Sequence, residues 1–380
     1  MKLSGQNTEN FGTKFLCLDH NFSKTFMSLS IGIIGLPNVG KSTLFKALTK
    51  RQVDISNYPF CTVSPNVGVV NVPDERIDKL AKVIKPEKIL PATIEFWDIA
   101  GLVKGAHQGE GLGNQFLEQI RKVDALCHLI RAFPSRNVSH VSGSIDSLRD
   151  IETVNLELIL SDFDLISKRI EVLEKRSKAG LLKEEEKLLE ILKKLSATLQ
   201  SGKLAKTLPL SEEEEKKIAD INLLTRKPVL YVLNVSQEQL ADKNWPKIPE
   251  IDLVISCQLE AELSDLSEKE RKDYIKEFRL EESGIDKLIK SAYQLLDIIT
   301  FFTIQNKILQ AWTIKRGTSV QKAGGKIHTD FEEKFIRAEV INWKDLVALG
   351  SELHAREKGK IRIEGKDYLV QDGDVIHFKI

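Results

Sequence analysis

Short apolar runs alternate with helical patterns through residues 27–140. Strands are expected where a run is continuous, at 29–34, 66–72, 93–98 and 124–131, and a helix is expected at 42–50. Such alternation is typical of a parallel sheet covered by helices. A later run at 229–234, followed by 253–256, has the same buried character. We therefore expect both stretches to belong to one α/β sheet.

Between these two stretches the apolar period changes to alternating spacings of three and four. The recurring positions are Leu156, Ile159, Phe163, Ile166, Ile170 and Leu173, and, after a break at 178–180, Leu188, Leu192, Leu195 and Leu199. This period predicts an antiparallel, coiled-coil-like helical hairpin inserted at 141–225. The charged residues around the stripe fit either a solvated face or an arm that binds a partner, and both readings stay open.

The pattern of apolar and polar residues changes again after Ile298. Short strands separated by turn signals are expected at 307–314, 335–340, 359–363, 367–370 and 375–379. We expect a compact α+β module at 297–380, and an α/β domain built from 27–140 and 226–296. Residues 1–26 are expected to be a flexible extension or to precede a misassigned start at Met27, with an ordered strand or helix as the alternative.

Composition changes this picture little. The chain has 380 residues, of which 42% are hydrophobic and 29% charged, and its net charge is +1. These values argue against disorder and against a surface that is basic throughout. The four cysteines are scattered, which is typical of reduced thiols in a cytoplasmic protein and argues against a zinc site or a disulfide framework. No stretch approaches the roughly 18 apolar residues of a membrane span.

The segment Gly35–Ser42 fits the phosphate-loop pattern GxxxxGK[ST], with a strand before it and a helix after it. Glycines allow backbone N–H groups to wrap phosphates, and Lys41 is placed to reach the β- and γ-phosphates of a nucleoside triphosphate. The Ser42 hydroxyl is a candidate ligand for Mg²⁺. The alternative, a glycine-rich turn that binds nothing, is disfavoured by the flanking elements.

Two further elements fit the same chemistry. Asp98 ends the strand 93–98 in a D-x-x-G segment, where a carboxylate supports the metal ion and Gly101 can approach a γ-phosphate. Thr62, in the loop between the two motifs, is a candidate second Mg²⁺ ligand, although an ordinary loop hydroxyl is the simpler reading. Leu102 stands where related switches carry a glutamine that orients water, so slow intrinsic hydrolysis is expected.

The base-reading motif of GTPases, Asn-Lys-x-Asp, is absent from the chain. The strand 229–234 ends instead in Asn234-Val235-Ser236-Gln237. Without the carboxylate, guanine loses its charge-assisted partner, whereas Asn234 and the backbone can serve adenine. We expect a preference for ATP, with GTP binding as the open alternative.

Together these residues resemble the YchF family, also called Obg-like ATPases. The resemblance runs from about Met27 to the C-terminus and is carried by GLPNVGKSTLF (35–45), NYPFCTVSPNVGVV (57–70), DIAGLVKGA (98–106), GEGLGNQFL (109–117), AWTIKRGT (311–318), GGKIHTDFEEKFIRAEV (324–340) and EGKDYLVQDGDVIHF (364–378). It implies a P-loop G domain interrupted by a coiled coil, followed by a TGS domain with a ubiquitin-like β-grasp fold.

The resemblance also implies roles for individual residues. ATP contacts are implied for the phosphate-loop residues Asn38, Val39, Gly40, Lys41, Ser42 and Thr43, and for Asn234 and Val235 in the base-reading turn. His140 matches a histidine implicated in hydrolysis, although a lone loop histidine is more often a surface residue. Asn38 resembles an asparagine that helps to bind activating K⁺. The family usually has glutamate where this chain has Gln237.

Three function classes remain to be compared. The leading hypothesis is a slow ATP-hydrolysing switch of the ribosome, monomeric and stimulated by its partner or by K⁺, with an RNA contact through the TGS domain. Residues 301–380 contain 14 Lys and Arg against 11 Asp and Glu, a weakly basic balance of +3 that is compatible with RNA. The alternative is a nucleotide-gated regulatory protein of the stress response with little turnover. A small-molecule kinase is disfavoured, because the insertion has a coiled-coil period and no lid pattern.

Overall fold

The computed structural model describes residues 29–51, 64–99, 112–134, 144–177, 180, 182–278 and 280–380. The predictions for Thr62, Gly101, Leu102, His140 and the N-terminal extension lie outside these residues. Among the described residues, no helix has both the length and the apolar character needed to cross a membrane.

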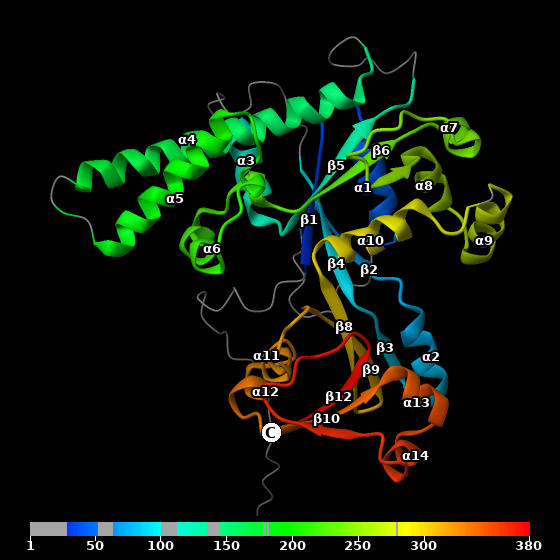
Figure 1. Cartoon of the computed structure of the whole chain (residues 1–380). Coiled ribbons are helices and arrows are strands. Elements are labelled where there is room, and N and C mark those ends of the chain that lie inside the picture. The colour runs from blue at the N-terminus through cyan, green and yellow to red at the C-terminus, as the bar shows by residue number, and fades with distance from the viewer. Residues whose placement is uncertain are drawn as a thin grey trace, which may run out of the picture.

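The first sheet joins the two halves of the α/β domain, as the sequence predicts (Figure 1). Across the sheet its strands are β2 (Val67–Asn71), β4 (Thr93–Asp98), β1 (Leu29–Ile34), β5 (Ala125–Arg131), β6 (Val229–Asn234) and β7 (Leu253–Ile255). Every residue of β5 is buried, as expected for a central strand covered on both faces. The expectation of a wholly parallel sheet is wrong at one edge, because β2 runs antiparallel to β4.

The helices of this domain come from both halves of the chain. They are α1 (Lys41–Thr49), α3 (Leu112–Lys122), α7 (Gln237–Asp242), α8 (Cys257–Leu263), α9 (Glu268–Glu277) and α10 (Gly284–Leu295). Helix α1 packs against α8, β2 and β4, and α10 packs against β6 and β7. The carboxyl ends of β1, β4, β5 and β6 therefore lie around the start of α1, where the phosphate loop is.

The insertion projects from the sheet as two long helices, α4 (Ser147–Ser177) and α5 (Lys183–Gln200), with α6 (Glu212–Ile218) beside them (Figure 1). A separate apolar cluster holds these helices together. Asp162 fixes their base to the sheet domain: its fully buried carboxylate accepts hydrogen bonds from the N–H groups of Leu224 (3.1 Å) and Thr225 (2.8 Å). It also accepts a bond from Arg121 at the end of α3 (3.1 Å).

The C-terminal module contains a second, mixed sheet. Its strands in order are β11 (Arg362–Glu364), β10 (Arg337–Asn342), β12 (Asp374–Lys379), β8 (Ile298–Gln305), β9 (Ile308–Lys315) and β3 (Lys88–Leu90). Its helices are α11 (Val320–Gly325), α12 (Thr329–Glu333), α13 (Trp343–Leu349) and α14 (Glu352–Glu357). The strand predicted at 367–370 is wrong. A turn closed by the bond from Tyr368 N–H to the carbonyl of Gly365 occupies its start, and a single bridge at Leu369 is all that remains of it.

One strand of this second sheet comes from the first domain. After β2 the chain forms α2 (Glu75–Ile84), adds β3 to β9 in parallel, and then returns to the first sheet as β4. The antiparallel edge arises in this excursion, because β4 re-enters the first sheet beside β2 in the opposite direction. Arg76 of α2 reinforces the junction: it pairs with Asp74 (2.7 Å) and with Asp372 (2.8 Å) of the C-terminal module.

Candidate nucleotide-binding site

The phosphate loop connects β1 to α1 and depends on two glycines. Gly35 has φ +147°, and a Cβ there would lie 2.4 Å from the carbonyl oxygen of Leu129. Gly40 has φ +104°, and a Cβ there would lie 2.5 Å from Nδ2 of Asn234. Other residues would be both strained and crowded at these positions. The glycines of the motif are therefore required by the fold of the loop, independently of any ligand.

Helix α1 offers an open N-terminus to a ligand. Its cap residue is Gly40, which has no side chain to satisfy the first N–H groups. Such N–H groups, together with the helix dipole, favour a phosphate group. Ser42 and Thr43 lie exposed in the first turn, as hydroxyls that face a nucleotide must.

Lys41 is buried, with 8% of its surface exposed. Its Nζ donates to the carbonyl oxygens of Gly35 (3.1 Å) and Leu36 (2.8 Å) within the loop. Burial lowers the pKa of Lys41 to about 8, and the negative charge of Asp98 opposes this shift. The ammonium group is thus held inside the loop at a cost in solvation that an anion would relieve.

Asp98 lies at the carboxyl end of β4, paired in register with Ile33 of β1, two residues before the phosphate loop. Burial raises the pKa of its carboxyl, and the charge of Lys41 opposes the rise. The Asp98 carboxylate lies close enough to Lys41 for their charges to interact, and the exposed Ser42 hydroxyl follows Lys41 in the chain. Both provide oxygen atoms, which are the ligands that Mg²⁺ prefers. The donor set fits a magnesium ion that keeps several of its waters. No cluster of three or more His, Cys, Asp or Glu side chains suited to a metal occurs in the described parts of the chain.

Asn234 links the base-reading turn to the phosphate loop. Its Nδ2 donates to the carbonyl oxygen of Val39 (2.8 Å), and its Oδ1 accepts from the N–H of Cys257 (2.9 Å). Both ends of this buried amide are therefore engaged within the protein, which the sequence did not indicate. The side chain of Val235 is buried, and its N–H donates to the carbonyl of Ile255. The turn is thus a rigid support on which a base can be placed.

Sequence reasoning missed the partner of Gln237. Its Nε2 donates to Oε2 of Glu262 (2.8 Å), and Gln258 donates to the other oxygen of the same carboxylate (3.2 Å). One of the two N–H donors of the Gln237 amide is therefore engaged by Glu262. The sequence contained a hint of this contact. β7 lies next to β6 in the sheet, and the helix that follows β7, α8, carries Glu262.

Comparisons with known proteins agree with this geometry. A family model described as "50S ribosome-binding GTPase" matches residues 30–162, and one described as "Protein of unknown function (DUF933)", YchF-GTPase_C, matches residues 298–380. The chain is 47% identical over 366 residues to the "Ribosome-binding ATPase YchF" of Bacillus subtilis (strain 168), covering 93% of this chain and 99% of the relative. It is 48% identical over 367 residues to the protein of that name from Mycoplasma genitalium, covering 92% and 99%.

A solved structure, the Schizosaccharomyces pombe YchF GTPase, superposes with a TM-score of 0.81 at 34% identity, covering 93% of this chain and 98% of that one. The likeness therefore spans the sheet domain, the helical insertion and the C-terminal module together. On this agreement of sequence, fold and phosphate loop, the chain belongs to the YchF family.

Proposed function

We propose that this protein is a Mg²⁺-dependent ATPase that acts as a slow nucleotide switch on the ribosome. The observation that carries the proposal is the position of the Asn234 amide, which connects the base-reading turn to the phosphate loop. The same turn lacks the aspartate with which GTPases bind guanine. Base and phosphates are thereby read by one connected unit. Relatives that are named ribosome-binding ATPases support the substrate and the partner.

In this proposal the phosphate loop holds the triphosphate through the N–H groups of Asn38 to Thr43. Lys41 leaves the carbonyls of Gly35 and Leu36 and turns to the phosphates. The metal ion would be held by Ser42, by Thr62 and, through water, by Asp98. Bound Mg²⁺ supplies neutralisation of the phosphate charge. Asn38 is the candidate for a K⁺ contact, and His140 for a role in hydrolysis.

Base preference is tested by competition against a fluorescent ATP analogue. We expect ATP to displace it at a concentration about tenfold lower than GTP, because a neutral amide replaces the carboxylate that guanine readers use. The matched variant is Asn234→Ala, which should weaken both nucleotides. Equal competition by ATP and GTP in the natural protein would refute the preference.

Turnover is proposed to be slow because Leu102 cannot orient a water molecule. Phosphate release should therefore be low with protein alone and should rise with ribosomes or with K⁺ in place of Na⁺. Turnover that stays equally slow in all three conditions would instead favour the nucleotide-gated regulatory protein of the stress response.

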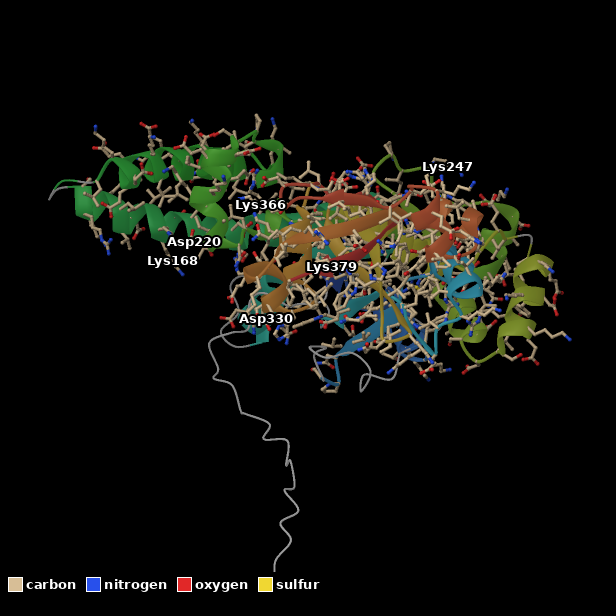
Figure 2. The ribbon with its side chains drawn as sticks, turned by 90° about the horizontal axis from the view of Figure 1, so that it is seen from below. Lys168, Asp220, Lys247, Asp330, Lys366 and Lys379 are labelled. Carbon is tan, nitrogen blue, oxygen red and sulfur yellow. The ribbon has the colours of Figure 1, made fainter. Side chains whose placement is uncertain are left out.

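Two parts of the surface are candidates for the ribosome contact. Figure 2 shows Lys168 and Asp220 on the projecting helical insertion, and Lys366 and Lys379 on the C-terminal module, which is proposed to be a TGS domain that contacts RNA. Co-sedimentation with ribosomes, with ATP analogue, ADP or no nucleotide, tests the partner. Protein that stays in the supernatant at every salt concentration would exclude it. A cytoplasmic monomer is the expected form.

A further inference from the structure

Two glutamine side chains beside the base-reading turn share one carboxylate. Gln237, the first residue of α7, donates from Nε2 to Oε2 of Glu262 (2.8 Å), and Gln258 of α8 donates from Nε2 to Oε1 of the same group (3.2 Å). The two helices follow adjoining turns, because Oδ1 of Asn234 accepts from the N–H of Cys257 (2.9 Å). Glu262 therefore reaches the edge of the base-reading turn from a helix that is not part of it.

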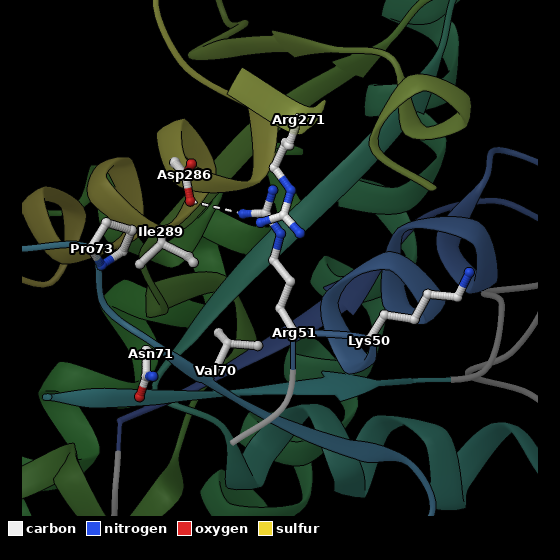
Figure 3. Close-up of a pocket in the computed structure, with 8 residues that line it drawn as sticks. All are labelled: Lys50, Arg51, Val70, Asn71, Pro73, Arg271, Asp286 and Ile289. Atoms are coloured by element: carbon white, nitrogen blue, oxygen red, sulfur yellow. Dashed lines mark hydrogen bonds and ion pairs between the residues drawn. The ribbon is translucent and has the colours of Figure 1, made fainter. Parts of the chain in front are cut away.

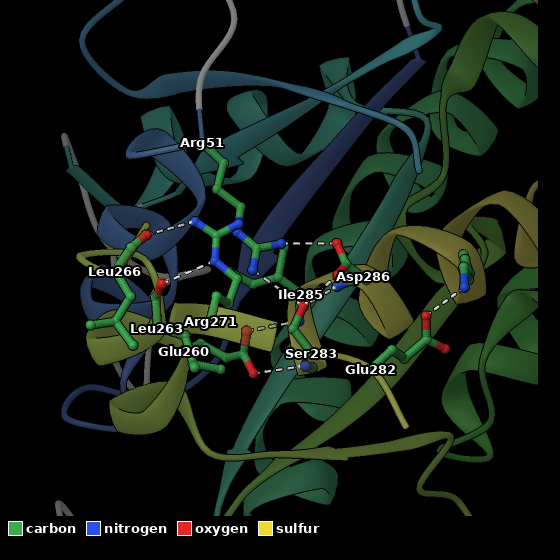
Figure 4. Close-up of polar contacts among 11 residues, drawn as sticks. Arg51, Glu260, Leu263, Leu266, Arg271, Glu282, Ser283, Ile285 and Asp286 are labelled. Atoms are coloured by element: carbon green, nitrogen blue, oxygen red, sulfur yellow. Dashed lines mark hydrogen bonds and ion pairs between the residues drawn. The ribbon is translucent and has the colours of Figure 1, made fainter. Parts of the chain in front are cut away.

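Helix α8 is a fixed support for this carboxylate. It packs against α1, whose C-terminal end is tied to α10 by the pair between Arg51 and Asp286 (2.9 Å) (Figure 3). On the buried face of α8, the carboxylate of Glu260 accepts from two N–H groups at the start of α10, those of Gly284 (2.7 Å) and of the next residue (3.1 Å) (Figure 4). The side chain of Glu262 is exposed, but the fold sets the place of its helix relative to the turn.

The chemistry of the shared partner restrains how both amides are oriented. An ionised carboxylate only accepts hydrogen bonds, whereas a glutamine amide carries an acceptor oxygen and a donor nitrogen. Turning either amide over would bring its oxygen to Glu262 and replace a charge-assisted bond by repulsion between oxygens. Neither amide oxygen has a hydrogen-bond partner among the residues that the structure describes. The bond to Glu262 is therefore what keeps each of the two amides from turning over.

Orientation decides which base such an amide can pair with. Adenine carries an amino donor at the position where guanine carries a carbonyl acceptor. An amide held in one orientation offers its donor and its acceptor at fixed places, so it matches one base better than the other. An amide that is free to turn over can match both. The aspartate of GTPases does not meet this difficulty, because both of its oxygens are acceptors.

We propose that Glu262 is a positioning residue for base selection, which holds the amides of Gln237 and Gln258 in the orientation that favours adenine. The inference rests on the ATP preference proposed above. It adds the group that maintains this preference in a turn where a neutral amide stands in place of a carboxylate. Glu262 acts through the two amides, so its effect requires them.

The test compares ATP and GTP as competitors of a fluorescent ATP analogue, using the full chain with Mg²⁺, in the natural protein and in Glu262→Gln. The variant keeps the shape of the side chain, but its amide can either accept or donate, so both neighbours are free to turn over. We expect the ratio of the GTP to the ATP dissociation constant to fall from about ten to below about three. The ratio is the diagnostic quantity, because the loss of a negative charge near a triphosphate changes the affinity of both nucleotides alike.

Two controls separate positioning from other effects. Glu277→Gln removes an exposed carboxylate from the neighbouring helix α9 and should leave the ratio unchanged. In a protein that carries Gln237→Ala and Gln258→Ala, the further change Glu262→Gln should leave the ratio unchanged as well, because the amides through which it acts are absent.

The possible outcomes are distinct. The same ratio in Glu262→Gln as in the natural protein would overturn the inference, and so would an equal fall of the ratio when the two amides are absent. Both of these results leave the proposed ATPase function and its ATP preference in place. Equal binding of ATP and GTP by the natural protein would overturn the proposed preference itself, and this inference with it.

Discussion

His128 lies in the middle of β5, beneath the phosphate loop, and is 1% exposed. Its Nδ1 has no hydrogen-bond partner among the described residues, and its ring lies 5.5 Å from that of Tyr231. Burial, and secondly the positive charge of Lys41, lower the pKa of His128 to about 3. The folded protein therefore keeps this imidazole neutral well below the pH at which an unfolded chain protonates it.

The consequence for stability follows from linkage. The pKa of His128 is lower in the folded protein than in the unfolded chain. The stability that the neutral His128 permits is therefore fully present above the unfolded pKa of 6.5, and it is lost as the pH falls from 6.5 toward 3. At pH 5.5 the protonated form of His128 outnumbers the neutral form about ten to one in the unfolded chain, which lowers the free energy of unfolding by about 1.4 kcal/mol. At pH 7.5 the same effect lowers the free energy of unfolding by only roughly 0.1 kcal/mol. The result is insensitive to the folded pKa, provided that it stays well below 5.5.

The perturbation is His128→Leu, which removes the titrating group and keeps an apolar side chain of similar size. Urea unfolding followed by tryptophan fluorescence should show that the natural protein loses about 1.3 kcal/mol more than the variant between pH 7.5 and pH 5.5. The exposed His354→Gln is the control and should behave like the natural protein. Equal losses in the natural protein and in His128→Leu would refute the reasoning.

Three further predictions concern the site and its support. Asn234→Asp should place an oxygen against the phosphate-loop carbonyl and lower nucleotide affinity at least tenfold in fluorescence titration, whereas weakening below twofold would contradict the link. Gln237→Asp combined with Glu262→Gln should raise GTP affinity relative to ATP about tenfold in the competition assay, and more than Gln237→Asp alone, where the two carboxylates would repel each other. Asp162→Ala should lower the free energy of unfolding by about 3 kcal/mol in urea, since it strands buried donors; a loss below 1 kcal/mol would count against it.

Much of the fold could be predicted because local patterns determine it. Continuous apolar runs identify β1, β4, β5 and β6, and the phosphate-loop motif fixes the turn between β1 and α1. The strand 88–90 could not be found in this way, since it is three residues long and only its partner β9, more than two hundred residues later in the chain, makes it a strand. The predicted strand at 367–370 failed for the opposite reason, because turn hydrogen bonds prevailed over its apolar residues.

The candidate nucleotide-binding site likewise has residues that the sequence predicts and contacts that it does not predict. Lys41, Ser42 and Asp98 are recognisable from spacing, since the chemistry of phosphate and Mg²⁺ demands those residue types at those distances along the chain. The two engagements of the Asn234 amide, and the contact between Gln237 and Glu262, depend on where β6 and β7 end in space. Residue spacing carries no information on such contacts, although the order of buried strands places the two turns side by side.

The path of the chain between β2 and β4 bears on how the nucleotide site and the C-terminal module can move relative to each other. β3 is hydrogen-bonded into the second sheet, and Arg76 pairs with Asp372, so the segment that leads into β4 is fixed to the C-terminal module. β4 ends at Asp98 beside the phosphate loop. A shift of the C-terminal module as a rigid body would therefore pull on the strand that carries Asp98. The helical insertion is attached differently, through Asp162 to Arg121 at the end of α3, which follows the D-x-x-G segment in the chain. The two candidate ribosome-binding parts are thus connected to the nucleotide site by separate elements, the C-terminal module through β3 and β4 and the helical insertion through α3.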